Sequence, residues 1–183
     1  PYSLLVALGL CAGYALLGAG WMIWRTEGEL QAKARRWGWI AAVATAGLLA
    51  AVSLATLVVH PRIAQRWGVS DGALDVAALA PLLPIPLVGL VGLAVVIWGL
   101  RGRQATALAG AYLVFLSGYI GLAVGFFPNI VPYDMDFRAA ANADNALGLM
   151  LVGVGILLPV ILGYTVWVYW LFRGKVGAHA GYH

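Results

Sequence analysis

Five uncharged apolar runs, each long enough to cross a bilayer as a helix, constrain this chain more than any other feature. A hydrocarbon core about 30 Å thick takes about 20 residues of helix to cross. The runs contain no Asp, Glu, Lys, Arg or His, and only 10% of the 183 residues are charged. They cover residues 2–24, 38–59, 76–100, 105–127 and 146–172. The sequence therefore predicts a membrane protein.

The runs are apolar on every face, which decides between the two architectures that can span a membrane. Transmembrane β-strands alternate apolar and polar residues over segments of about ten residues, and these runs do not. We predict an all-α, polytopic transmembrane helix bundle with five spans, forming a single membrane domain over residues 1–183. Residue 1 is Pro rather than Met, and residues 1–17 lack the basic start and cleavage pattern of a signal peptide, so we expect further chain before Pro1.

The basic residues predict an orientation, because Lys and Arg beside the ends of spans favour the cytoplasmic side. If alternate loops lie on alternate sides, eight basic residues fall on one side and three on the other. The larger group is Arg25, Lys33, Arg35, Arg36, Arg101, Arg103, Arg173 and Lys175. The smaller group is Arg62, Arg66 and Arg138. We therefore place Pro1 on the periplasmic side and His183 in the cytoplasm, and the net charge of +4 requires no nucleic-acid partner.

The polar stretch "WRTEGELQAKARRWGW", residues 24–39, interrupts the apolar sequence once, between the first two runs. Thr26 followed by Glu29 matches a capping box, in which each side chain accepts a hydrogen bond from a free backbone N–H at a helix start. We expect the second helix to begin about three turns before the membrane. Arg35 and Arg36 are expected to affect insertion or assembly rather than catalysis.

The third run contains "PLLPIP", with Pro81, Pro84 and Pro86. Proline removes a backbone donor and disturbs the preceding turn, so we expect regular helix only after Pro86 and an irregular segment before it. Broken helices of this kind can form ion or solute sites in transporters. A structural kink is the simpler interpretation, because no charged residue lies nearby.

Small residues at spacings of four predict close helix packing. They occur at Gly9 and Gly13 in the first run and at Ser117, Gly121 and Gly125 in the fourth.

Few residues offer cofactor chemistry. His60 beside Pro61 is the one histidine next to a span and therefore a weak candidate for an axial haem ligand, as is Met150 in the last run. His179 and His183 lie in a glycine-rich tail, and Cys11 is the sole cysteine, so we predict no cysteine metal cluster. Ionisable residues inside a membrane tend to mark function, and these runs have none. We therefore predict no catalytic, cofactor-binding or metal residue in this chain, which favours a supporting subunit.

Three blocks of the sequence carry a family resemblance. They are "YALLGAGWMIWRTEGELQAKARRW" (Tyr14–Trp37), "FFPNIVP" (Phe126–Pro132) and "LGLMLVGVGILLPVILGYTVWVYWLFRGKV" (Leu147–Val176). In this order they resemble subunit II of the cytochrome bd-type quinol oxidases, including the cyanide-insensitive branch. The match is to the carboxyl-terminal part of the family's chain, so we expect its amino-terminal spans to be missing here.

The resemblance implies a respiratory complex of the bacterial inner membrane that oxidises ubiquinol or menaquinol and reduces oxygen to water. It implies that subunit I carries the b- and d-type haems and the quinol site, while subunit II binds no haem. Expected partners are subunit I, small accessory membrane peptides, and lipid or quinone. Two rival hypotheses are a small-solute membrane transporter, suggested by "PLLPIP", and a packing protein without chemistry, suggested by the uncharged runs.

Overall fold

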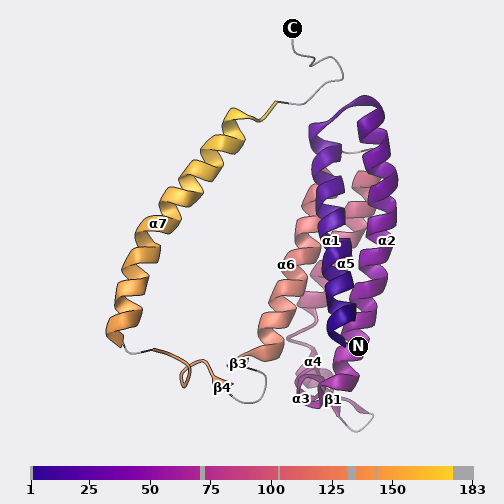
Figure 1. Ribbon diagram of the computed structural model, residues 1–183. Coiled ribbons are helices and arrows are strands. Elements are labelled where there is room, and N and C mark those ends of the chain that lie inside the picture. The colour runs from indigo at the N-terminus through magenta and orange to yellow at the C-terminus, as the bar shows by residue number, and fades with distance from the viewer. Residues whose placement is uncertain (1, 71–72, 103, 132–134, 143, 175–183) are drawn as a thin grey trace. The chain divides into compact units, whose positions relative to one another are not determined.

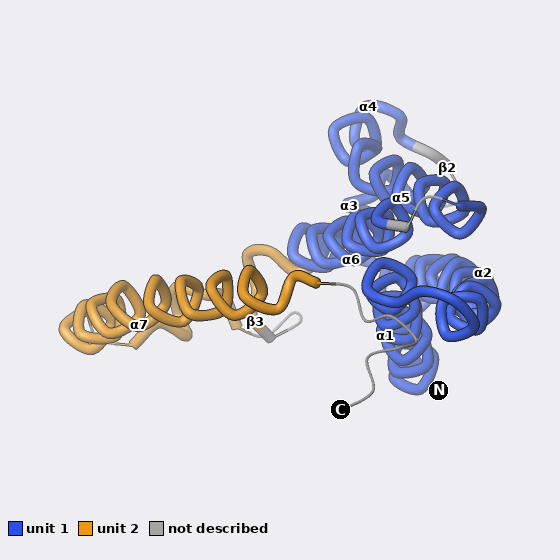
Figure 2. The backbone as a smooth tube through the Cα atoms, turned by 90° about the horizontal axis from the view of Figure 1, so that it is seen from above, with its two compact units in different colours: residues 1–125, 175–183 blue, residues 126–174 orange. Residues whose placement is uncertain are grey.

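This computed structural model describes residues 2–70, 73–102, 104–131, 135–142 and 144–174. Several residues of the sequence predictions lie outside the described part: His179, His183, Arg103, Lys175 and Pro132. The described residues form two compact units, one ending at Gly125 and the other Phe126–Gly174, coloured separately in Figure 2.

Four long helices of the first unit, α1, α2, α5 and α6, run alongside one another (Figure 1). The first is α1, Tyr2–Arg25, and the second is α2, Gly28–Val59. Only two residues separate them, which Gly28 permits because its φ of +69° lies in the left-handed region that favours glycine. Arg25 in the last turn of α1 complements the negative end of the helix dipole.

The start of α2 corrects the predicted capping box. Glu27 occupies the N-cap position, and its side chain makes no capping hydrogen bond. Thr26 instead donates its hydroxyl hydrogen to the carbonyl of Met22, at 2.7 Å, and so continues α1. The prediction that α2 begins about three turns before the second apolar run is confirmed, because Gly28 precedes Gly38 by ten residues.

A segment of short helices and strands connects α2 to α5 at the end of the unit where α1 begins (Figure 1). It contains α3, Pro61–Arg66, the antiparallel strands β1, Val69–Ser70, and β2, Ala73–Leu74, and the short α4, Val76–Leu79. Asp75 caps α4, since its carboxylate accepts hydrogen bonds from the backbone N–H groups of Ala77 and Ala78. These caps and turns satisfy backbone groups that the lipid could not.

The third predicted span is broken, as the prolines suggested. Residues 80–83 form turns between α4 and α5, and α5 comprises Pro84–Leu100. Regular helix begins at Pro84 rather than after Pro86 as predicted, because Pro at the first helical position costs no hydrogen bond. At 1.5 Å per residue the 17 residues of α5 cover about 25 Å, less than a full hydrocarbon core.

After a turn at Arg101 and Gly102, α6 runs from Gln104 to Phe126. The helices α1, α2, residues Ala105–Phe126 of α6, and α7 of the second unit are long and apolar enough to span a membrane, and α5 is a shorter apolar helix. The chain is therefore an all-α polytopic membrane protein.

The core of the first unit receives side chains from all four long helices and is made mostly of small residues. Small side chains let helix backbones approach closely, which compensates for the lack of a hydrophobic driving force in lipid. Its members are Leu16, Ile23, Ala34, Ala41, Ala42, Val96, Leu100, Ala107 and Ala111.

The second unit contains a short hairpin followed by one long helix. Strands β3, Asn129–Val131, and β4, Met135–Asp136, pair antiparallel with a register irregularity, and α7 comprises Asp144–Leu171. Pro159 lies inside α7. Near the end of α7 the guanidinium of Arg173 lies 4.7 Å from the ring centroid of Trp170, an aromatic–cation pair typical of a membrane interface.

Candidate functional site

The candidate haem ligand His60 lies where α2 ends and α3 begins. Its ring packs edge-on against Tyr2, with ring centroids 5.4 Å apart. The Tyr2 hydroxyl in turn lies 2.8 Å from the hydroxyl oxygen of Thr56. The imidazole is therefore part of the contact between the first residue of α1 and the last turn of α2.

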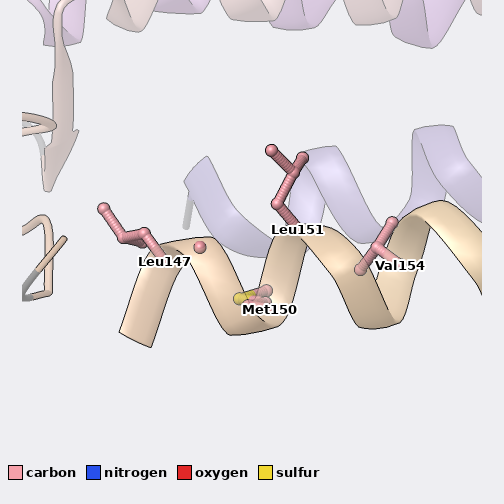
Figure 3. A pocket seen from close by; sticks show the side chains of 5 residues that line it. Leu147, Met150, Leu151 and Val154 are labelled. Atoms are coloured by element: carbon pink, nitrogen blue, oxygen red, sulfur yellow. The ribbon is translucent and has the colours of Figure 1, made fainter. Parts of the chain in front are cut away.

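The second candidate ligand, Met150, lies on α7 beside a shallow apolar hollow. The hollow is lined by Leu147, Gly148, Met150, Leu151 and Val154, which share one face of the helix (Figure 3). It contains no polar side chain that could orient a cofactor. The part of the chain that the structure describes contains no group of three or more His, Cys, Asp or Glu that could hold a metal ion.

The polar interactions of the first unit are concentrated at the two ends of its bundle. At one end, Arg35 of α2 donates hydrogen bonds from Nη1 to the carbonyls of Leu100, at 2.9 Å, and Gly99, at 3.4 Å. Its Nη2 lies 3.5 Å from the carbonyl of Gly102. The Leu100 carbonyl is the last one of α5, and no residue farther along that helix can satisfy it, whereas the Gly99 carbonyl also accepts from the backbone N–H of Gly102. Arg35 therefore caps α5 and joins the α1–α2 turn to the α5–α6 turn.

At the same end of the bundle, Gln31 of α2 connects α2 to the end of α1. Its side-chain amide donates to the carbonyls of Ile23, at 2.9 Å, and Thr26, at 2.8 Å. The carbonyls at the end of α1 are thereby satisfied from the second turn of α2. Gln31 thus caps the end of α1, as Arg35 caps the end of α5.

At the opposite end, Arg66 of α3 donates from Nη1 to the carbonyl of Val124 near the end of α6, at 2.9 Å. A cation at a helix C-terminus is favoured by the helix dipole. Arg35 and Arg66 thus act alike at opposite ends of the bundle: Arg35 ties α2 to the last turn of α5, and Arg66 ties α3 to the last turn of α6.

Between these ends, α5 and α6 are held by close backbone contact and by a side-chain hydrogen bond from Ser117. A Cβ added to Gly92 would lie 2.9 Å from the backbone nitrogen of Val114, and one added to Gly110 would lie 2.7 Å from the carbonyl oxygen of Gly92. Ser117 is buried and donates its hydroxyl hydrogen to the carbonyl of Ile85, at 2.7 Å. This hydrogen bond anchors the first turn of α5 just after the proline-rich break.

The predicted small-residue faces find partners inside the first unit. Gly121 faces Ile85 and Gly125 faces Ile63 of α3. Gly9 faces Leu48 of α2, whereas Gly13 faces the ring of Phe115 on α6. The repeats in the first and fourth runs therefore pack within this chain.

A model of one protein family matches the chain over residues 1–172, which include all five apolar runs, and the family is described as cytochrome bd terminal oxidase subunit II. The chain belongs to this family. None of the curated proteins searched matches it. As a subunit II, the chain is one component of a terminal oxidase and associates with another oxidase subunit.

Membership of the cytochrome bd subunit II family confirms the resemblance of the three sequence blocks. Sequence reasoning missed the contacts of Gln31, Arg35 and Arg66, because each acceptor carbonyl lies in another element. Only the positions of these residues hinted at the contacts, since a long polar side chain one or two turns beyond an apolar run can reach the end of a neighbouring helix. Nothing in the sequence identified the acceptor.

Proposed function

We propose that this chain is the haem-free subunit II of a bd-type respiratory quinol oxidase and supports, as scaffold and subunit interface, a partner that oxidises quinol and reduces oxygen to water. The observation that carries this proposal is the family match over residues 1–172 in a chain whose apolar runs hold no Asp, Glu, Lys, Arg or His. Proton relays inside a membrane use such side chains. The partner, subunit I, would supply the b- and d-type haems.

The interior of the first unit supports a scaffold role. It is built from Ala, Gly, Leu, Val and Ile, with Thr45 and Ser117 as its buried polar residues within the helices. The stronger hydrogen bonds lie at the bundle ends, where Arg35 and Arg66 bind backbone carbonyls. Such a bundle can present a fixed surface to a partner subunit, and its apolar interior offers few groups for catalysis.

The proposed location is the bacterial cell membrane, with the Pro1 side periplasmic. Arg35 brings the α1–α2 and α5–α6 turns to one end of the first unit, so the basic residues of both turns lie on one side. Their excess makes that side cytoplasmic under the charge rule. Accessory membrane peptides and a bound lipid or quinone are further partners that the family suggests.

The test is to purify the tagged chain from native membranes and record reduced-minus-oxidised visible spectra. We expect a multi-span partner to co-purify with b- and d-type haem bands, and the haem to remain with that partner when the subunits are separated. Stoichiometric haem on the separated chain would contradict the proposal. Purification without any partner or haem would contradict it as well.

The break at residues 80–83 favours one second candidate, a small-solute transporter. The start of α5 is, however, tied to α6 by the hydrogen bond from Ser117 and packed against Gly121, as expected for a structural kink. Solute uptake by vesicles that contain the chain without a partner would favour the transporter.

A further inference from the structure

One face of α2 is exposed from its polar start into its apolar part. Lys33, Arg36, Trp37, Ile40 and Val43 follow the i, i+3, i+4, i+7 spacing of a single helical face, and all are exposed. The exposed fraction is 67% for Trp37, 54% for Ile40 and 68% for Val43. Along this face the order is two cations (Lys33 and Arg36), an indole (Trp37) and two aliphatic side chains (Ile40 and Val43). We call it the α2 outer face.

The two cations of the α2 outer face are not engaged by the described protein. Lys33 and Arg36 make no hydrogen bond or ion pair with any described residue, whereas the adjacent Arg35 is occupied by the end of α5. Arg101 is exposed between two residues whose carbonyls Arg35 binds, and so adds positive charge at the same end. One acid, Glu29, lies a turn farther out on the same face and makes no ion pair with Lys33.

The length of the face fits a lipid molecule. From Lys33 to Val43 the rise along the helix is about 15 Å, of which about half, from Lys33 to Gly38, precedes the apolar run and lies at the level of lipid headgroups, and the rest lies beside acyl chains. Cations at this level meet phosphate groups, an indole lies at the interface, and aliphatic side chains contact acyl chains. A soluble anion would use only the cations, and a zwitterionic lipid would leave their charge uncompensated.

We propose that the α2 outer face binds an anionic phospholipid, with the phosphate between Lys33 and Arg36, the glycerol region at Trp37 and an acyl chain along Ile40 and Val43. Charge complementarity and the order of side chains carry this proposal. It depends on the chain being a membrane protein and not on the proposed oxidase role, so either can fail without the other.

The test is native mass spectrometry of the delipidated, purified assembly, titrated with phosphatidylglycerol or phosphatidylcholine. We expect the double variant K33Q/R36Q to bind phosphatidylglycerol about 30-fold more weakly, because each basic residue near an anionic surface contributes a factor of about five. Binding of phosphatidylcholine should stay unchanged. The charge-conserving variant K33R/R36K should bind phosphatidylglycerol as the wild type does.

Unchanged phosphatidylglycerol binding by K33Q/R36Q would overturn the proposal, and would be the outcome if a partner protein covers this face in the assembly. Competition by glycerol phosphate as strong as that by the lipid would also overturn it, because the apolar part of the face would then contribute nothing. Equal thermal stability of the lipid-free wild type and both variants excludes a folding defect as the cause of weaker binding.

Discussion

Thr45 of α2 is the residue whose environment is least expected in a membrane helix. It is only 5% exposed, and its hydroxyl oxygen has no hydrogen-bond partner. Ser53, Thr56 and Thr165, by contrast, each donate their hydroxyl hydrogen to the backbone carbonyl four residues earlier in the same helix. The orientation of the Thr45 side chain thus leaves a buried polar group unsatisfied, at a cost in folding free energy.

The first prediction is that Thr45→Val stabilises the protein. Valine has nearly the same shape as threonine, and replacing an unsatisfied buried hydroxyl by a methyl group recovers roughly 1–3 kcal/mol. Thermal unfolding in detergent should show a higher midpoint temperature. Thr56→Val is the matched control, and it should lower the midpoint, because the Thr56 hydroxyl lies 2.8 Å from that of Tyr2. A lower midpoint for Thr45→Val would show that the hydroxyl has a stabilising partner.

The second prediction compares the contributions of Arg35 and Arg36 to stability, which the sequence alone does not distinguish. Arg35→Gln removes charge-assisted hydrogen bonds to the end of α5 and should destabilise the protein by roughly 1.5–3 kcal/mol. Arg36→Gln makes the same change in charge one residue away on an exposed side chain, and should change the stability by less than about 0.5 kcal/mol. Both are measured by thermal unfolding in a zwitterionic detergent. Equal losses for the two variants would mean that net charge, and not the contact with α5, stabilises this end.

At the scale of elements, the contact between α5 and α6 depends on glycines that allow two backbones to touch. A Cβ on Gly99 would clash with the backbone nitrogen of Ala107, and backbone cannot move aside as the end of a side chain can. The sequence predicted small-residue packing on the first and fourth runs. It did not identify the glycines of α5, since they are spaced by three and seven residues rather than by four, and "PLLPIP" drew attention to the other end of that helix.

The third prediction therefore compares two glycine-to-alanine changes. Gly99→Ala forces α5 and α6 apart and should cost about 1–3 kcal/mol of stability. Gly47→Ala, in α2, meets nothing within 4 Å and should be neutral or stabilising by up to about 1 kcal/mol through its helix propensity. Detergent-denaturation midpoints measure both. Tolerance of Gly99→Ala at wild-type stability would contradict the close approach of the two helices.

At the scale of the whole molecule, the predictions that succeeded rest on local composition. Length and hydrophobicity alone predicted the spans, and three prolines predicted the break before α5, because both follow from backbone hydrogen bonding in lipid. The capping box failed, because Thr26 had a competing acceptor in Met22 and the helix started later. Contacts such as Arg35 with Leu100 join residues 65 positions apart, and no local pattern encodes them.

The last prediction concerns orientation, which the charge rule proposes and which labelling can measure. Cys11 is the sole cysteine, so a Cys11→Ser background permits one cysteine to be placed at a time. Ala32→Cys lies at the start of α2 and Ala139→Cys follows β4, and both positions are exposed. With the basic turns in the cytoplasm, a membrane-impermeant maleimide should label the Ala139→Cys variant in intact cells and the Ala32→Cys variant only after the cells are opened. The chain with Cys11 alone reports labelling inside a span, which we expect to be slow on either side. Labelling of the Ala32→Cys variant in intact cells would place the basic end outside, in which case the excess of Lys and Arg there would act in partner or lipid binding rather than in setting the topology.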